Sequence, residues 1–184
     1  MNFDWRDIWE KKGKVSDVDL KLLDGFEKTN IDPKNVSDQI KKELCVDDSS
    51  SVLEVGCGAG MLAQYFQSHY VGIDYSESLI NKHREILPSK VFVAEADNLP
   101  FKDGEFEHVF SYSVFHYFPS KEYVKKCISE MKRVAKKGIL IGDLPIRSHD
   151  INHLLFSSLE FPEWNISDGY HNPDRFNISM GIKD

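Results

Sequence analysis

The chain has few cysteines, and they form no pattern that would build a covalent or metal-bound framework. Its 184 residues include three, Cys45, Cys57 and Cys127, which are widely spaced and contain no Cys-x-x-Cys pair. A disulfide scaffold or a structural zinc site needs paired, closely spaced cysteines. The pattern therefore excludes both, predicts no metal site, and favours a reducing, cytoplasmic location.

Long apolar runs are also missing. No segment approaches the ~20 apolar residues that a membrane-spanning helix needs. Residues 1–7 contain neither the basic nor the apolar region of a secretory signal peptide. We therefore expect no membrane partner.

Positive charge is in deficit. The chain carries 23 Lys and Arg against 30 Asp and Glu, a net charge of −7, and its longest basic runs are pairs such as 125–126 and 136–137. A nucleic-acid partner usually requires a basic face, so we expect none. Length and a hydrophobic content of 41% are those of one globular domain with a sizeable core.

The most informative segment present is residues 52–60, Val-Leu-Glu-Val-Gly-Cys-Gly-Ala-Gly. A short β-branched run enters a glycine loop, where positive φ angles and a close approach of a ligand to the backbone become possible. The dinucleotide fingerprint G-x-G-x-x-G would need glycine at position 61, which is methionine. Residues 61–69 have helical composition, so we expect a helix whose free N–H groups face a ligand. A plain glycine turn is the alternative.

Strand and helix patterns alternate from this point. Strands are expected near residues 52–55, 70–74, 90–95, 108–112 and 138–143, and helices near 60–68, 77–86 and 120–136. Such alternation predicts a doubly wound, mostly parallel α/β sheet with helices on both faces. Its ligand belongs at the carboxyl ends of the strands, where the strand order reverses.

The chain is interpreted as a single domain, 1–184, in three parts. Residues 1–50 form an N-terminal helical cap, in which Trp5 and Trp9 share one helix face and act either as an aromatic lid or as structural residues. Residues 51–145 form the core. Residues 146–184 form a shortened C-terminal part, with a helix within 148–157 and a strand pair near 160–166 and 176–182.

Four segments together carry a family resemblance: the glycine loop, residues 70–76 and 91–101 with their terminal carboxylates, and 106–113 followed by 114–118. Their order resembles the class I S-adenosylmethionine-dependent methyltransferases, in particular the small-molecule group with a methyltransferase 11-like domain. The resemblance covers residues 50–145 strongly and the tail weakly. It implies a Rossmann-like fold, S-adenosylmethionine as donor, S-adenosylhomocysteine as product, and direct in-line displacement by a small-molecule acceptor.

The resemblance assigns donor-binding roles to the glycine loop. It implies that Glu54, Gly56 and Gly58 contact or admit the methionine moiety, whose ammonium group suits a carboxylate. Cys57, inside the loop, is either a nucleophile or a small buried packing residue.

The ends of the second, third and fourth strands complete this donor site. Asp74, followed by Tyr75, would accept both ribose hydroxyls, or else cap the helix that follows. Asp97 would accept from the adenine amino group, or else serve as a turn residue. Asn98 and Leu99 would flank the ring, and Ser111 would offer a backbone carbonyl.

Acceptor residues are expected after the fourth and fifth strands. His116 and Tyr117 would line the mouth of the site, with His116 as general base because imidazole titrates near neutrality. Packing on the donor is the alternative for His116. Asp143 would orient the acceptor or act as base, or else form a turn. Tyr112 and His171 are weaker candidates.

Other functions fit the sequence less well. A nucleic-acid amine methyltransferase would carry an Asp/Asn-Pro-Pro-aromatic motif at 111–114, a protein-arginine methyltransferase would carry paired glutamates after that strand, and a reductase lacks its third glycine. The serious alternative is a non-catalytic S-adenosylmethionine-binding module. Its acceptor pocket would need a homodimer or a partner subunit for completion.

Overall fold

One mixed sheet of seven strands organises the computed structural model, which describes residues 4–66, 69–147 and 150–182. The strand order is β3-β2-β1-β4-β5-β7-β6, and β7 runs antiparallel to both of its neighbours while the other pairs are parallel. The strands are β1 (Val52–Val55), β2 (Tyr70–Asp74), β3 (Lys90–Val93), β4 (Phe106–Tyr112), β5 (Ala135–Pro145), β6 (Asn165–Asp168) and β7 (Arg175–Gly181). The expected doubly wound sheet and its C-terminal strand pair are confirmed.

Short polar residues begin most of the helices. Asp32 accepts from the first-turn amides of α3, and Ser76 and Ser120 do the same for α4 and α5. The helices are α1 (Trp5–Lys12), α2 (Leu20–Leu23), α3 (Pro33–Leu44), α4 (Glu77–Ile86) and α5 (Lys121–Val134), with 3-10 turns η1 (Ala63–Tyr65), η2 (Phe115–Tyr117) and η3 (Ser158–Glu160). In the described part of the chain, no helix is both long and apolar enough to cross a bilayer.

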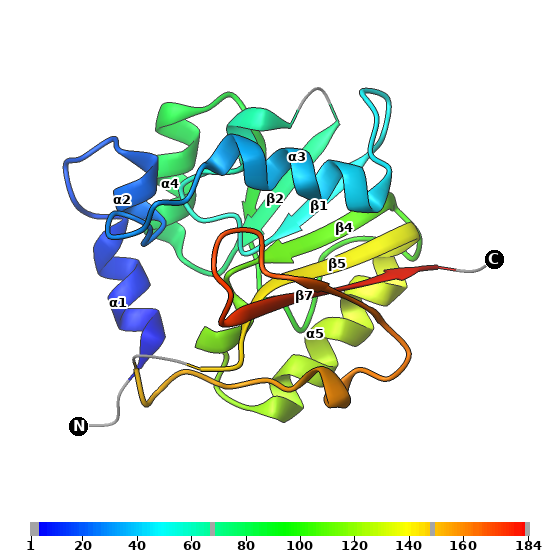
Figure 1. Cartoon of the computed structure of the whole chain (residues 1–184). Helices are drawn as coiled ribbons and strands as arrows, with labels where there is room; N and C mark the ends of the chain where they lie inside the picture. Colours follow the sequence, from blue (N-terminus) through cyan, green and yellow to red (C-terminus); the bar gives the residue numbers. More distant parts are fainter. Residues whose placement is uncertain (1–3, 67–68, 148–149, 183–184) are drawn as a thin grey trace.

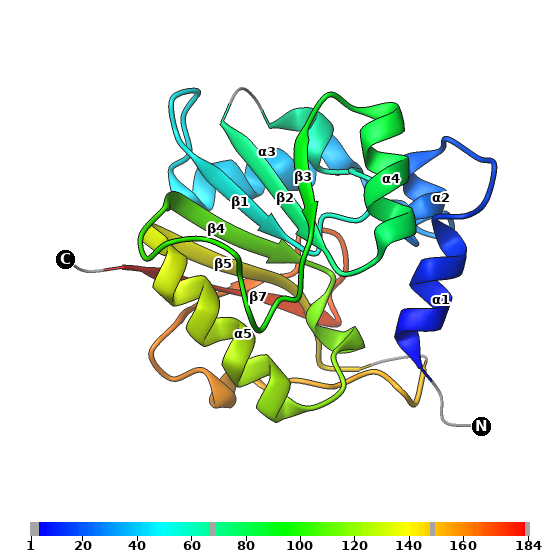
Figure 2. The ribbon, with the colours of Figure 1, turned by 180° about the vertical axis from the view of Figure 1, so that it is seen from behind.

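The two faces of the sheet carry separate cores. On one face, Val36 and Ile40 of α3 and Ile80 of α4 pack with Val52 and Phe110. On the other face, α5 buries an apolar stripe of Val124, Cys127, Met131 and Val134. The connection from β5 to β6 adds buried aromatic rings in place of a helix. Figure 2 shows α5 lying across the face opposite α3.

Two expected helices are wrong. Instead of a helix over 60–68, the chain forms only η1, because Phe66 turns inward to stack on Phe110 at 5.0 Å and the chain then returns to β2; residues 67–68 lie outside the described part. The helix expected within 148–157 is absent from its described residues, 150–157, which form turns and extended chain. Residues 148–149 lie outside the described part.

The carboxyl ends of the parallel strands point toward α1 and α2 (Figure 1). The glycine loop after β1, the carboxylate at the end of β2 and the segment after β4 therefore meet beneath the N-terminal cap. This is the end of the sheet at which the sequence predicts a ligand.

Candidate functional site

The glycine loop after β1 has the conformation that its glycines allow. Gly56, Gly58 and Gly60 have φ angles of +83°, +51° and +105°, a region that side chains disfavour. The Gly58 amide donates to Asp74 Oδ2 at 3.0 Å. The loop is thus tied to the end of β2.

A hollow with about 650 Å³ of empty space, partly open to solvent, lies over this loop. Aromatic and apolar side chains form much of its wall, among them Trp9, Phe26, Tyr112 and Tyr117. Its acidic groups are the carboxyl groups of Asp24, Glu54 and Asp74. No lysine or arginine occurs among the described residues that line the hollow. The hollow therefore favours a cation bound between aromatic walls.

Burial changes the acidity of these three carboxyl groups. It raises the pKa of Glu54 to about 8, although the Tyr70 hydroxyl donates to Glu54 Oε2 at 2.5 Å and opposes the shift. It raises the pKa of Asp24 to about 7 and that of Asp74 to about 6, again against backbone N–H donors. A bound cation would favour the ionised forms and offset this cost.

Asp24 is a site residue that sequence reasoning missed. It follows the four-residue helix α2, and its two oxygens accept from the backbone amides of Ala59 and Met61 at 2.6 and 2.8 Å. No motif surrounds it in the sequence. Only the folding of the cap over the glycine loop brings it to the site.

A second hollow adjoins the first between the ends of β2, β3 and β4. Its walls include Tyr75, Ala94, Ala96, Phe118 and Tyr123, which together form an apolar slot suited to a flat ring. Residues of α1 close it: Trp5 and Arg6 also line it, and the Arg6 guanidinium lies 4.6 Å from the centre of the Tyr75 ring.

The residues after β3 are arranged differently from the expectation. Among the described residues, Asp97, Asn98 and Leu99 line neither hollow. The Leu99 amide instead donates to Glu130 Oε2 of α5 at 2.8 Å, which draws this stretch away from the slot. Glu95 also lines neither hollow, but it lies between the wall residues Ala94 and Ala96 and accepts from the hydroxyl of Tyr123 at 3.3 Å. Asp97 as the acceptor from adenine stays a prediction, and Glu95 is the alternative that the structure adds.

Ser111 and Cys57 pack more deeply than a ligand contact requires. The Ser111 hydroxyl donates to the Val55 carbonyl at 2.7 Å, and Ser111 is absent from the walls of both hollows. A contact between the Ser111 backbone carbonyl and S-adenosylmethionine stays a prediction. Cys57 lines the first hollow, but burial raises the pKa of its thiol well above the ordinary value. This favours the packing alternative over a nucleophile.

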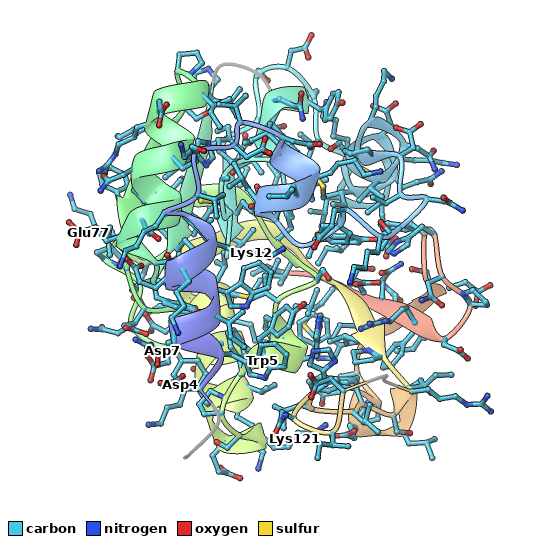
Figure 3. All side chains as sticks on the ribbon, turned by 90° about the vertical axis from the view of Figure 1, so that its left-hand side faces the viewer. Asp4, Trp5, Asp7, Lys12, Glu77 and Lys121 are labelled. Atoms are coloured by element: carbon cyan, nitrogen blue, oxygen red, sulfur yellow. The ribbon has the colours of Figure 1, made fainter. Side chains whose placement is uncertain are left out.

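Tyr117 stands where the two hollows meet, and it lines both. Trp5 and Trp9 of α1 contact its ring edge-to-face, with centroids 4.7 and 5.0 Å away. Trp5 points from α1 toward the body of the protein, whereas Asp7 and Glu77 point away from it (Figure 3). This arrangement supports the aromatic lid that the sequence left as an alternative.

His116 lies behind Tyr117 and lines neither hollow in the described part of the chain. It is buried, with its ring 4.0 Å from that of Tyr117 and 4.7 Å from that of His153. Of the two residues expected at the mouth of the site, Tyr117 thus lines the hollows and His116 does not. His116 as a base stays a prediction, and the geometry favours its packing alternative.

Asp143 reaches the first hollow only through other side chains. The Tyr112 hydroxyl, on the wall of the hollow, lies 3.0 Å from His171 Nδ1, and His171 Nε2 lies 3.9 Å from Asp143 Oδ1. Arg175 Nε lies 4.0 Å from the same oxygen. Asp143 is buried at a φ of +63°, and burial raises its pKa. Its expected contact with an acceptor is replaced by a role behind Tyr112.

The fold and the site define a Rossmann-like domain that binds a ligand over a glycine loop. Residues 53–141 match the sequence pattern of the family described as "Methyltransferase domain". Magnesium protoporphyrin IX methyltransferase of Synechocystis PCC 6803, solved with bound S-adenosylhomocysteine, has a TM-score of 0.66 at 15% identity, covering 96% of this chain and 94% of that one. The chain thus carries the sequence pattern of a methyltransferase domain over residues 53–141, and its fold is the one found in solved S-adenosylmethionine-dependent methyltransferases.

Relatives with curated names share only part of their length with this chain. The match to a "Probable tRNA methyltransferase 9B" of Mus musculus is 38% identical and covers 48% of this chain but 20% of that protein. "Trans-aconitate 2-methyltransferase" of Rhodopseudomonas palustris is 26% identical over 66% of this chain and 48% of that protein. These names include both an RNA and a small acid, so the acceptor has to be argued from the site.

The residues present fit the donor. A Cβ on Gly58 would lie 2.2 Å from Asp24 Oδ1, so the loop leaves room only for a backbone without side chains beneath the ligand. The apolar slot suits adenine, Asp74 suits the ribose, and the carboxylates suit the α-ammonium group and the sulfonium of the donor.

Proposed function

We propose that the chain transfers the methyl group of S-adenosylmethionine to a small-molecule acceptor by in-line displacement. The observation that carries this proposal is the continuity of the two hollows. Gly56, Asp74, Tyr75, Val114 and Tyr117 line both of them, so one donor would extend from the adenine slot, past Asp74, to the aromatic end above the glycine loop.

Asp74 would orient the donor through its ribose. Its two oxygens already accept from the amides of Gly58 and Ser76, at 3.0 and 2.9 Å, and each retains a lone pair for a hydroxyl group. The expected capping alternative is filled by Ser76, whose hydroxyl accepts from the Leu79 amide. Asp74 is therefore available for a ligand.

The bound donor supplies a methyl group that its sulfonium already activates. The acceptor atom forms a bond to this methyl, the sulfur takes the electron pair of the broken bond and leaves as a thioether, and the acceptor gives up a proton. The protein's contribution is then mainly positioning in line and exclusion of water. Tyr117 and the tryptophans of α1 would form that dry, shaped wall.

The charge of the site supports a small acceptor without phosphate groups. Asp24, Glu54 and Asp74 face the first hollow, and its remaining wall is largely aromatic and apolar. A polyanion would bring like charges into a partly buried site, which is costly at low dielectric. We therefore favour a neutral or cationic small molecule over RNA.

The test is turnover with a panel of small phenols, amines, thiols and carboxylic acids, with S-adenosylhomocysteine measured by mass spectrometry. We expect product with at least one neutral or cationic member, and none with the Asp74→Ala variant. A chain that binds S-adenosylhomocysteine yet turns over no member of the panel would support the binding-module alternative. Turnover of RNA alone would contradict the small-molecule proposal.

A further inference from the structure

Asp24 belongs to a part of the chain that lies outside the family match, which covers residues 53–141. Its position is nevertheless fixed by several contacts. Lys12 Nζ of α1 donates to the Leu22 carbonyl of α2 at 2.8 Å. Gly25, the next residue, lies so close to Trp9 that a Cβ there would be 2.8 Å from its indole ring. Contacts between α1 and the segment that contains α2 thus hold Asp24 against the glycine loop.

Anchoring the cap does not by itself require a charged group at this position. The carboxylate accepts from the Ala59 and Met61 amides, and a serine or asparagine oxygen could also accept from such an amide. A carboxylate here faces the same hollow as Glu54 and Asp74. Ionising a third acid in that place is costly unless a cation is present.

The ligand class that the domain binds provides such a cation. The donor and its product carry an α-ammonium group on the amino-acid end, and the glycine loop lies at that end of the site. The amides of Ala59, Met61 and Gly60 occupy three of the about four lone-pair sites of the Asp24 carboxylate, so one site remains for a further donor. A charged N–H to carboxylate bond is among the stronger hydrogen bonds in proteins.

We propose that Asp24, contributed by the N-terminal cap, binds the α-ammonium group of the donor and so makes the cap part of the donor site. This inference rests on the proposed function, because it assumes that the donor occupies the two hollows. It assigns a ligand contact to a segment whose sequence carries no donor-binding motif. It also gives the cap a role in donor selection in addition to covering the site.

The experiment compares three probes by calorimetry. S-Adenosylhomocysteine carries both the ammonium and the carboxylate, its decarboxylated amine keeps only the ammonium, and 5′-methylthioadenosine lacks the amino-acid end. For Asp24→Asn we expect about 10- to 100-fold weaker binding of the first two, the range for a hydrogen bond to a charged group. Binding of 5′-methylthioadenosine should change by less than about twofold.

Asp19→Asn is the matched control. Asp19 begins the same helix by accepting from the Lys21 and Leu22 amides, and it lies outside the walls of both hollows. We expect it to leave the binding of all three probes unchanged. If thermal unfolding shows that Asp24→Asn is not folded, Asp24→Ser, which retains an acceptor for one loop amide, replaces it.

The possible results separate the two proposals. Failure of the wild type to bind any probe contradicts the proposed function itself. Normal binding of the wild type with an unchanged Asp24 variant contradicts this inference alone. An equal loss for 5′-methylthioadenosine would show a structural role instead, and tighter binding of S-adenosylhomocysteine by the variant would show that Asp24 faces the carboxylate.

Discussion

Glu54 is buried in surroundings that oppose its charge. It is 3% exposed, and its carboxyl accepts from the hydroxyl of Tyr70, whose own pKa burial raises well above the ordinary value. A buried carboxylate of this kind lowers the stability of the unliganded fold, and it increases the affinity of the site for a cationic ligand. The same reasoning applies to Asp74, so the donor site stores unfavourable electrostatics that a cationic ligand relieves.

The sign of the pH dependence follows from this burial. With a folded-state pKa of about 8 for Glu54, above that of the unfolded chain, the folded protein binds the extra proton and stability falls as pH rises toward 8. Glu54→Gln should therefore raise Tm by several degrees at pH 8.5 and by much less at pH 5. For a chain of this length, a change of 1 kcal/mol in the free energy of unfolding shifts Tm by about 2–4 °C. Thermal unfolding at both pH values measures it.

Glu77→Gln is the control for that experiment, because Glu77 is an exposed residue in the first turn of α4. It should show no comparable rise at high pH. A shift of equal size at pH 5 and pH 8.5 in Glu54→Gln would mean that packing, not charge, is responsible.

Asp74 should dominate recognition of the ribose. Asp74→Ala removes the acceptor of two hydroxyls and also frees the Gly58 amide, so we expect a loss of about 2–3 kcal/mol in S-adenosylhomocysteine binding. Isothermal calorimetry measures it. Asp47→Ala, an exposed turn residue that accepts from Ser49, is the control. A loss below threefold would leave Asp74 as a purely structural residue.

Among the elements, the glycine loop restricts the residue type most strongly. Gly58 combines a φ of +51° with a Cβ position 2.2 Å from Asp24 Oδ1. Gly58→Val should abolish donor binding in calorimetry. Gly104→Val controls for backbone strain, because Gly104 also has a positive φ, of +59°. A Cβ on Gly104 would face the Lys136 side chain, and Gly104 lines neither hollow. Equal effects of the two substitutions on donor binding would contradict a local role for the loop.

Two substitutions after β3 test whether Glu95 or Asp97 accepts from the adenine amino group. Glu95 pairs with Arg6 of α1 and accepts from Tyr123, a wall residue of the adenine slot. Glu95→Gln should weaken binding of 5′-methylthioadenosine about tenfold, the cost of losing one charged acceptor. Asp97→Asn should leave it unchanged. The opposite order in a calorimetric titration would favour Asp97 instead.

The elements that sequence predicted well are those with strong local signals. The β-branched run before the glycine loop and the carboxylate of Asp74 at the end of the next strand are each recognisable within a few residues. The helix expected after Gly60 failed because a tertiary contact of Phe66 overrides local composition. Propensity is a weak guide against such packing.

The part of the site that sequence missed comes from distant segments. Asp24 has no motif around it, and it reaches the loop only because α1 and α2 fold over the strand ends. His116 was expected at the mouth because it follows β4, and Asp143 was expected near the acceptor because it follows the fifth expected strand. Strand ends fix a residue's position and not the direction of its side chain. Tyr117 and Tyr112 take the wall positions instead.

At the scale of the whole molecule, the cap, the sheet end and the net negative charge act together. Trp5 and Arg6 close the adenine slot and Trp9 and Asp24 close the other hollow, so the N-terminal cap covers both parts of the expected donor. A net charge of −7 discourages association with polyanions. This arrangement supports the proposed function, in which one covered site holds a cationic donor and a small acceptor.

The central claim is that the two hollows hold S-adenosylmethionine, and titration of the wild-type chain with S-adenosylhomocysteine tests it most directly. We predict binding of one molecule per chain with micromolar affinity and no binding of NAD under the same conditions, because position 61 is methionine and not the third glycine of the dinucleotide fingerprint. The absence of S-adenosylhomocysteine binding, or binding of NAD in its place, would contradict the account.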